Sequence, residues 1–275
     1  MTNQPVLVVG ATGKTGSRVA TKLETIGLPV RRGARRSDTP FDWEDQATWA
    51  PILNGVSKAY VTYFPDLAFP GAIEKLETFS RVALDAGLQH LVLLSGRGEY
   101  FAGMGEEVIR NSGLGFTIVR SAWFAQNFSE GYLRDPILGG VLPMPGGDTP
   151  EPIIDIDDIA DVVVAALTED RHLGERYEVT GPRLMTFAEM ADVLTATLGR
   201  PIRHLPISFE DFHANVATSG DMFVADVFTA IARETLDGRN AYTADGVQRA
   251  LGRKPRDFAE FARAAMSTGA WSAVA

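Results

Sequence analysis

The chain has 275 residues, of which 45% are hydrophobic and 22% are charged, and this length suits one α/β unit with a small appended lobe. It contains no cysteine, which excludes disulfide bonds, thiolate nucleophiles, iron–sulfur clusters and cysteine-bound zinc. The formal net charge of −9 argues against a general nucleic-acid binder, because phosphate contacts require a clustered basic face. We therefore expect a small molecule as the partner and no nucleic acid.

No apolar run, the segment 162–167 included, approaches the roughly 18–20 residues that a bilayer requires. Residues 1–5 show no basic region followed by an apolar one, so no signal peptide is indicated. The sequence predicts no membrane contact and a cytoplasmic location.

The first half of the chain alternates between strand and helix. Short continuous apolar runs predict buried parallel strands, and apolar residues at helical spacing predict helices. In chain order we expect a strand at 6–9, a helix at 14–26, a strand at 29–34, a short helix at 49–53, a strand at 59–64, a helix at 70–86, a strand at 90–95, a helix at 104–112 and a strand at 116–119. This alternation predicts an α/β fold with a doubly wound parallel sheet of the Rossmann type, which binds ligands at the carboxyl ends of its strands.

The second half has a different pattern. Proline and glycine cluster at 136–152, which indicates a loop region. A helix is expected at 157–168, with Asp157 or Asp158 as its N-cap. Thr186-Phe-Ala-Glu189 is a capping-box pattern that opens a further helix.

After Ser208 the sequence predicts almost continuous helix. We therefore expect residues 1–121 to form a nucleotide-binding core. Residues 122–275 should combine the remaining sheet strands with a smaller C-terminal, mostly helical substrate lobe, without a sharp boundary between the two.

A glycine-rich loop follows the first strand and opens the first helix, with Gly10, Gly13 and Gly16 at regular spacing. Glycine at these places permits a tight turn, lets the backbone approach a pyrophosphate, and allows close packing of helix on strand. The helix N-terminus adds free N–H groups for the phosphates. The alternative is an ordinary glycine-rich turn. The loop predicts a dinucleotide site made of Gly10, Thr12, Gly13, Lys14, Thr15 and Gly16.

The run Gly13-Lys14-Thr15 resembles the end of a P-loop. That motif requires a glycine five residues before Gly13, where this chain has Val8 inside the strand. ATPase or GTPase chemistry is therefore excluded.

The end of the second strand is basic, which bears on the choice of dinucleotide. An acid at this place binds the ribose 2′-hydroxyl of NAD, whereas an arginine suits the 2′-phosphate of NADP. Here Arg35, Arg36 and Ser37 precede the first acid, Asp38. The alternative is a solvated basic edge. We expect NADP(H) to be preferred over NAD(H).

Seven segments form a recognisable pattern: 10–16 (GATGKTG), 41–45 (FDWED), 92–95 (VLLS), 117–128 (TIVRSAWFAQNF), 155–160 (DIDDIA), 181–186 (GPRLMT) and 252–258 (GRKPRDF). Together they resemble the NmrA-like atypical short-chain dehydrogenases/reductases, and within them the ergot-alkaloid dehydrogenase branch and its bacterial relatives. The resemblance covers nearly the whole chain, and its motifs are more specific for the superfamily than for the substrate.

The resemblance implies roles for further residues. It places Asp42 and Trp43 beside the adenine, and Tyr63, Phe64 and Pro65 along the middle of the cofactor. It places Ser95 and Gly96 near the nicotinamide ribose, and Trp123, Phe124 and Asn127 around the nicotinamide and the substrate. Trp123, Phe124 and Phe128 could instead be core aromatics. Tyr100 is a candidate polar contact in the substrate pocket, with an ordinary surface residue as the alternative.

The Tyr-x-x-x-Lys proton donor of typical short-chain dehydrogenases is missing, because none of the six tyrosines has a lysine four residues later. Where many NmrA-like relatives carry a lysine, this chain has Glu106 and Glu107. Without an acid, hydride addition to a ketone meets a large barrier, whereas an iminium ion, an imine, a quinone or an activated alkene is reduced more easily. We expect an acceptor of this kind and assign no catalytic residue. Glu99 or Glu107 could attract a cationic acceptor.

The four histidines are scattered and no metal-ligand spacing occurs, so no metal site is expected. Two functions remain open. One is an NAD(P)H-dependent reductase. The other is a non-catalytic, NADP-binding redox sensor of the NmrA type, which also lacks the Tyr-x-x-x-Lys motif. A nucleotide-sugar epimerase is strongly disfavoured, because it needs the missing tyrosine and lysine.

Overall fold

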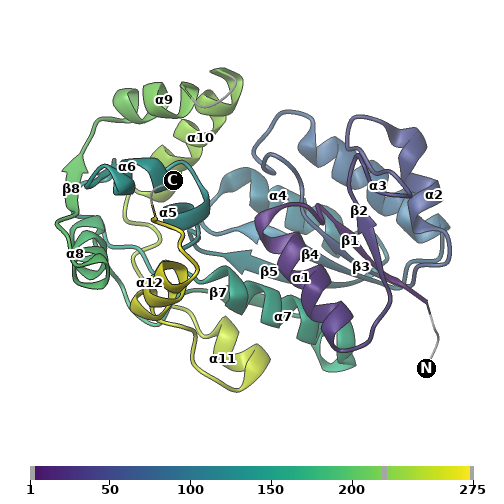
Figure 1. The fold of residues 1–275 in the computed structure, drawn as a ribbon. Coiled ribbons are helices and arrows are strands. Elements are labelled where there is room, and N and C mark those ends of the chain that lie inside the picture. The colour runs from purple at the N-terminus through teal and green to yellow at the C-terminus, as the bar shows by residue number, and fades with distance from the viewer. Residues whose placement is uncertain (1–3, 219–221, 273–275) are drawn as a thin grey trace.

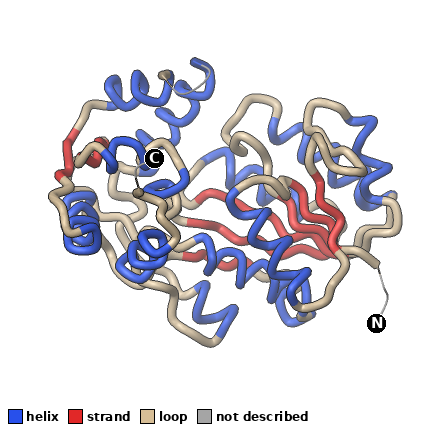
Figure 2. Tube along the Cα trace, viewed as in Figure 1, coloured by secondary structure: helices blue, strands red, loops and turns tan. Residues whose placement is uncertain are grey.

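A six-stranded parallel sheet forms the centre of the molecule in the computed structural model, which describes residues 4–218 and 222–272 (Figures 1 and 2). Each strand runs parallel to its neighbours. In spatial order the strands are β2 (Val30–Gly33), β1 (Val6–Val9), β3 (Lys58–Val61), β4 (His90–Gly96), β5 (Gly115–Ser121) and β7 (Arg176–Val179). The predicted doubly wound α/β sheet is confirmed.

Helices cover both faces of the sheet, because successive residues of a buried strand point to opposite sides. Val6 and Val8 of β1 pack in one apolar cluster, and Leu7 and Val9 pack in another. The first face carries α1 (Lys14–Thr25), α7 (Ile156–Thr168) and α11 (Gly246–Leu251). The second carries α2 (Trp49–Leu53), α3 (Ala72–Asp85) and α4 (Tyr100–Arg110). The 3₁₀ turn Gln46–Thr48 precedes α2, and the 3₁₀ turn Asp170–His172 follows α7.

The other elements form a lobe beside the carboxyl edge of the sheet, with an apolar core of its own (Figure 1). Its two short strands pair with each other in parallel and do not join the main sheet. The lobe consists of α5 (Asn127–Glu130), α6 (Arg134–Leu138), β6 (Val141–Met144), α8 (Phe187–Leu198), β8 (Arg203–Pro206), α9 (Phe209–Ala217), α10 (Met222–Thr235) and α12 (Phe258–Ser267).

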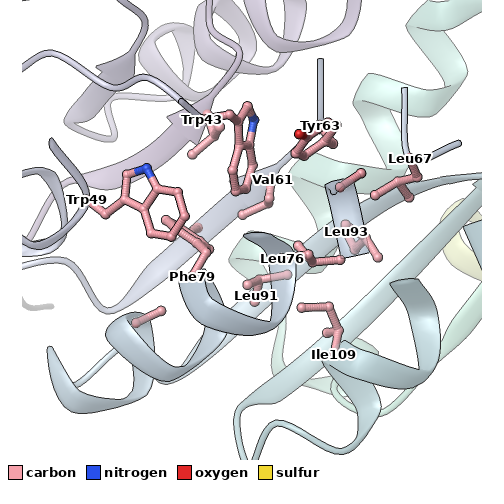
Figure 3. Packing of buried hydrophobic residues seen from close by; sticks show 14 of the residues in the cluster. Trp43, Trp49, Val61, Tyr63, Leu67, Leu76, Phe79, Leu91, Leu93 and Ile109 are labelled. Atoms are coloured by element: carbon pink, nitrogen blue, oxygen red, sulfur yellow. The ribbon is translucent and has the colours of Figure 1, made fainter. Parts of the chain in front are cut away.

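Aromatic rings build the core under α2 and α3 (Figure 3). The ring of Phe79 lies 5.3 Å from that of Trp43 and 5.8 Å from that of Trp49, both in edge-on contact, which is a preferred arrangement of aromatic pairs. The indole Nε1 of Trp49 donates a hydrogen bond of 2.7 Å to the carbonyl of Asp42. These contacts fix Asp42 and Trp43 at the edge of the sheet.

The structure corrects three local predictions. The segment 136–152 is not one loop, because it contains the end of α6 and all of β6. Helix α3 starts at Ala72 rather than at residue 70, because Gly71 adopts the left-handed conformation, with φ +80°, just before it.

The third correction concerns the start of α7. The N-cap is Asp155, whose carboxylate accepts from the N–H of Asp157. The side chain of Asp158 is buried and pairs with Arg253 and Arg256, so it holds the chain after α11 instead of capping the helix.

The capping box of Thr186 and Glu189 is confirmed, and helices α9 to α12 confirm the helical character after Ser208. Residues 1–3 of the N-terminal segment, together with 219–221 and 273–275, lie outside the described residues. In the part that is described, no helix combines the length and apolarity needed to cross a bilayer.

A buried carboxyl group lies where the chain leaves the lobe strand β6. The backbone of Glu151 exchanges hydrogen bonds with that of Met185, and its side chain is 1% exposed. Neither carboxylate oxygen has a hydrogen-bond partner within residues 4–218 and 222–272. Burial raises the pKa of Glu151 to about 7, although the charge of Arg97 opposes the shift.

This raised pKa makes stability depend on pH. The folded state holds the proton of Glu151 more tightly than the unfolded chain does. The stabilisation that this proton gives to the folded state is therefore complete below the unfolded pKa of 4.5 and is lost as the pH rises through about 7. Relative to Glu151→Gln, the wild type should lose about 3 kcal/mol of unfolding free energy across this window, at about 1.4 kcal/mol per pKa unit.

Urea denaturation at several pH values measures this difference. The exposed Glu107→Gln serves as the matched control and should follow the wild type. Parallel curves for the wild type and Glu151→Gln would contradict the prediction.

Candidate functional site

A cavity of about 840 Å³ lies between the carboxyl edge of the sheet and the lobe. It begins at the loop after β1, passes the ends of β2, β3, β4 and β5, and reaches residues of α9 and α10. The strand order reverses between β1 and β3, and doubly wound sheets bind their ligands at such a reversal. The volume lies within the range of small-molecule and cofactor sites.

The cavity collects most of the residues that the sequence singled out. Its lining includes Gly10, Thr12, Gly13, Lys14, Thr15, Arg35, Asp42, Trp43, Tyr63, Phe64, Pro65, Ser95, Gly96, Trp123, Phe124 and Asn127. The lining does not include Gly16, Arg36, Ser37 or Tyr100.

The backbone of the glycine loop is too closely packed at Gly10 and Gly16 to admit a side chain there. Gly10 has a φ of +74°, and a Cβ there would lie 2.5 Å from Cγ2 of Thr62. A Cβ on Gly16 would overlap the carbonyl oxygen of Gly10, so Gly16 serves the packing of α1 on β1. Gly13 is the N-cap of α1 and offers no capping side chain. The first N–H groups of α1 therefore remain open to an anion, which suits the pyrophosphate of a dinucleotide.

Lys14 adds a positive charge to this loop. Its Nζ donates a hydrogen bond of 2.8 Å to Oδ1 of Asn127 at the start of α5. Burial lowers the pKa of Lys14, while the charge of Glu130 opposes the shift. The contact ties the phosphate loop to the first helix of the lobe.

A hydrogen bond from the central sheet holds Thr15 in place. Its Oγ1 accepts a hydrogen bond of 2.9 Å from the hydroxyl of Tyr60, which is fully buried in β3. Burial raises the pKa of Tyr60, so this hydroxyl stays protonated as a structural donor.

The arginines in β2 and in the turn after it fall into two groups. Arg31 donates to the carbonyls of Ile52 and Asn54, and Arg32 pairs with Glu24, so both are held by the protein. Arg35 lines the cavity beside Gly33. Its guanidinium has no ion-pair partner in the described part of the chain.

Arg36 is exposed outside the lining. The Oγ of Ser37 donates to the carbonyls of Ala34 and Thr39, and therefore shapes the turn that presents Arg35.

The loop after β3 forms one wall of the cavity. The ring of Tyr63 lies 4.8 Å from that of Trp43, whose Nε1 donates to the carbonyl of Thr62. Phe64 is 73% exposed at the mouth. This wall is aromatic where the resemblance places the middle of the cofactor.

Ser95 and Gly96 end β4 inside the cavity. The Oγ of Ser95 donates a hydrogen bond of 2.6 Å to Glu106, which also pairs with Arg120. Glu106 is thus buried in a structural network, and Glu107 pairs with Arg110 on the surface. Neither of the two glutamates that replace the expected lysine lines the cavity.

The far end of the cavity belongs to the lobe. Trp123 lines it, and its Nε1 donates a hydrogen bond of 3.1 Å to Oγ1 of Thr235 on α10. Phe128 lies instead in the lobe core, where its ring meets that of Phe258. Tyr100 is 66% exposed at the start of α4 and contributes nothing to the lining.

Sequence reasoning missed several lining residues. Asp66 lines the cavity, and so does Glu99, which the sequence offered only as one of two alternatives. Both follow the ends of adjacent strands, β3 and β4, which is the signal that could have singled them out. Further missed residues include lobe and loop side chains with no local motif, among them Leu67, Tyr132, Phe212, Phe228 and Ile231.

The histidines take part in packing and hydrogen bonding. Nε2 of His90 lies 2.9 Å from Oγ1 of Thr117, and Nδ1 of His172 lies 2.7 Å from the hydroxyl of Tyr177. Within the described residues, no group of three or more histidine, aspartate and glutamate side chains could hold a metal ion.

Curated relatives match the chain over most of its length, although no family model matches. The NAD(P)H azoreductase of Xenophilus azovorans is 30% identical over 94% of this chain and 97% of its own. The (4-alkanoyl-5-oxo-2,5-dihydrofuran-3-yl)methyl phosphate reductase of Streptomyces griseus is 31% identical over 93% and 96%. Festuclavine dehydrogenase of Aspergillus fumigatus is 27% identical over 94% and 96%.

Solved structures share the fold. An NADPH-dependent quinone oxidoreductase of Escherichia coli, in complex with NADPH, superposes with a TM-score of 0.79 at 20% identity, covering 95% of this chain and 99% of the other. A mutant of NmrA superposes with a TM-score of 0.70 at 15% identity, covering 95% of each.

The relatives are reductases and dehydrogenases, which confirms the prediction of an enzyme of the NAD(P)H-dependent reductase class. The chain belongs to the NmrA-like atypical short-chain dehydrogenase/reductase family, and its relatives include clavine dehydrogenases and a bacterial azoreductase.

The close packing of the glycine loop yields a prediction. In Gly16→Ala, the new methyl group would overlap the carbonyl oxygen of Gly10 and displace the loop from the start of α1. We expect NADPH affinity to fall at least tenfold, measured by fluorescence titration.

Gly103→Ala is the control, because a Cβ at Gly103 in α4 meets nothing within 4 Å. Equal affinity of wild type and Gly16→Ala would contradict the assignment of the loop.

Proposed function

We propose that this protein is an NADPH-dependent reductase that transfers hydride to a small organic acceptor: an iminium ion or imine, a quinone, or an activated alkene. The observation that carries the proposal is the continuous cavity, which joins a phosphate-binding loop at one end to an aromatic and carboxyl-bearing chamber at the other. The named activities of the relatives, on azo, furanone and clavine compounds, agree with acceptors of this kind.

The glycine loop and Lys14 would hold the pyrophosphate, and Arg35 the 2′-phosphate. Asp42 and Trp43 would flank the adenine, and Ser95 and Gly96 the nicotinamide ribose. Bound NADPH would supply the hydride at its nicotinamide ring. The chain itself positions the acceptor and excludes water from it, which is a large part of the catalysis in such sites.

The tyrosines of the cavity are poor proton donors. Burial raises the pKa of both Tyr63 and Tyr132, and the hydroxyl of Tyr132 faces Sδ of Met144 at 3.7 Å. The residues four positions later are Leu67 and Pro136 rather than lysine. Neither tyrosine has the Tyr-x-x-x-Lys spacing, although Lys75 lies near Tyr63 and opposes the rise of its pKa. The missing spacing favours acceptors that are already electrophilic.

The direct test is consumption of NADPH against a panel of cyclic iminium ions, quinones and activated alkenes, with NADH in parallel. Turnover of a panel member supports the reductase. NADPH binding without turnover of any member would oppose it and favour a sensor.

The choice of cofactor has its own prediction. A hydrogen bond to a charged group is worth about 1.5–3 kcal/mol, so Arg35→Ala should weaken NADPH binding by roughly tenfold to a hundredfold. NADH, which lacks the 2′-phosphate, should lose less than about twofold, because only the phosphate contact is removed. Isothermal titration of both nucleotides measures the two effects.

The matched control is Arg32→Ala, since Arg32 is paired with Glu24 outside the cavity. Equal losses for NADPH and NADH in Arg35→Ala would refute a role in 2′-phosphate binding.

A further inference from the structure

Two carboxyl groups line the chamber half of the cavity. Asp66 follows β3 and Glu99 follows β4, and these strands are neighbours in the sheet. The two side chains interact, because Asp66 is among the groups that raise the pKa of Glu99. A protonated carboxyl group can donate a hydrogen bond, whereas an ionised carboxylate can only accept.

The surroundings hold the pair in place. Asp66 is fixed by a hydrogen bond of 2.8 Å from the N–H of Ala68 to its Oδ1. Glu99 stands at the N-cap of α4, but its side chain does not cap that helix. It turns back instead over Gly96, where its carboxyl group fills the space that a Cβ would occupy. Glycine at position 96 is therefore what lets Glu99 reach the cavity.

The charges around Glu99 all favour its neutral form. Burial raises its pKa well above the usual range, and the anionic side chains of Asp66 and of Glu234 on α10 raise it further. Burial also raises the pKa of Asp66. Oε2 of Glu99 is buried and meets no hydrogen-bond donor among residues 4–218 and 222–272.

The nearby arginines are held elsewhere. Arg97 pairs with Glu178 and donates to the carbonyls of Asn240 and Tyr242. Arg239 of the loop after α10 pairs with Asp237 and Glu234. Two neighbouring carboxyl groups without a cation beside them oppose each other's ionisation, which favours one proton on the pair at neutral pH.

We infer that Asp66 and Glu99 share this proton and that Glu99 is the proton donor to the acceptor, with Asp66 as the positioning residue that keeps the proton on it. The inference rests on the proposed reductase function. It assigns to a carboxyl pair the task that Tyr-x-x-x-Lys performs in typical short-chain dehydrogenases.

Hydride transfer together with proton transfer from Glu99 accounts for the full reduction of a neutral activated alkene. One carbon of its double bond receives hydride from the nicotinamide, which is oxidised, and the alkene is reduced by two electrons. The π-electron pair shifts to the other carbon and forms the new bond to the proton, while the O–H bond of Glu99 breaks and leaves its electrons on the carboxylate. Solvent returns the proton to the pair. A cationic iminium acceptor needs no such proton.

The protonation state of Asp66 and Glu99 can be measured without an acceptor. Glu151 also holds a proton near pH 7, so the measurement uses the Glu151→Gln background. In that background, the infrared spectrum at pH 7 should contain a carbonyl band of a protonated carboxyl group that disappears when Glu99→Gln is added. Glu107→Gln on the exposed face of the same helix should keep the band. An unchanged band in Glu99→Gln would overturn the shared proton and, with it, the inference.

The kinetic test compares a neutral activated alkene with a cyclic iminium ion. Glu99→Gln should lower turnover of the alkene by at least about a hundredfold, the usual effect of a lost general acid, and turnover of the iminium ion by less than about threefold. NADPH affinity should stay within about twofold, which verifies a folded cofactor site.

Asp66→Asn supplies a second variant. Without the anionic neighbour, the pKa of Glu99 falls, so the loss of kcat/KM for the alkene at high pH should begin at a lower pH than in the wild type. An unshifted profile would overturn the role of Asp66 as the positioning residue.

The outcomes separate the two proposals. No turnover by the wild type would overturn the proposed function together with this inference. Turnover by the wild type with an equally active Glu99→Gln would overturn this inference alone, as would equal losses for alkene and iminium ion.

Discussion

The site depends on how closely the backbone packs where β1 ends. Gly10 turns the chain in a left-handed conformation against Thr62 at the end of β3, and Gly16 lets α1 start against the carbonyl of Gly10. A side chain at either place would push the helix from the strand. With this contact made, the open N–H groups of α1 point to the crevice between β1 and β3, where the strand order reverses.

The cavity lining carries charges of both signs. Lys14 and Arg35 lie at the end that we propose for the phosphates, and the carboxyl groups of Asp66 and Glu99 lie in the chamber. Asp42, Glu44 and Arg97 also belong to the lining. Neighbouring acids and bases are neutralised within the protein, as in the pair of Glu106 with Arg120. We propose that the chamber holds one proton-bearing carboxyl pair among mostly apolar and aromatic side chains, where electrostatic effects are strong.

The lobe completes the chamber through contacts between segments far apart in the chain. Trp123 after β5 bonds to Thr235 on α10, and Arg97 after β4 bonds to the carbonyls of Asn240 and Tyr242. These bonds place Phe228 and Ile231 of α10 in the cavity wall. We propose that the sheet and its loops hold the cofactor and that the lobe shapes the acceptor half, where family members can differ without a change of fold.

The sequence alone determined the doubly wound sheet, the glycine loop and the reductase family, because strand periodicity and the spacing of Gly10, Gly13 and Gly16 are local signals. It did not find β6, whose pairing with β8 joins segments about sixty residues apart. It could not choose between Glu99 and Glu107, because both are glutamates near the same helix. Only the tertiary structure decided this: the missing side chain of Gly96 admits Glu99 to the cavity beside Asp66, while Glu107 stays on the surface. Burial and proximity across strands are properties of the folded chain, and no local pattern encodes them.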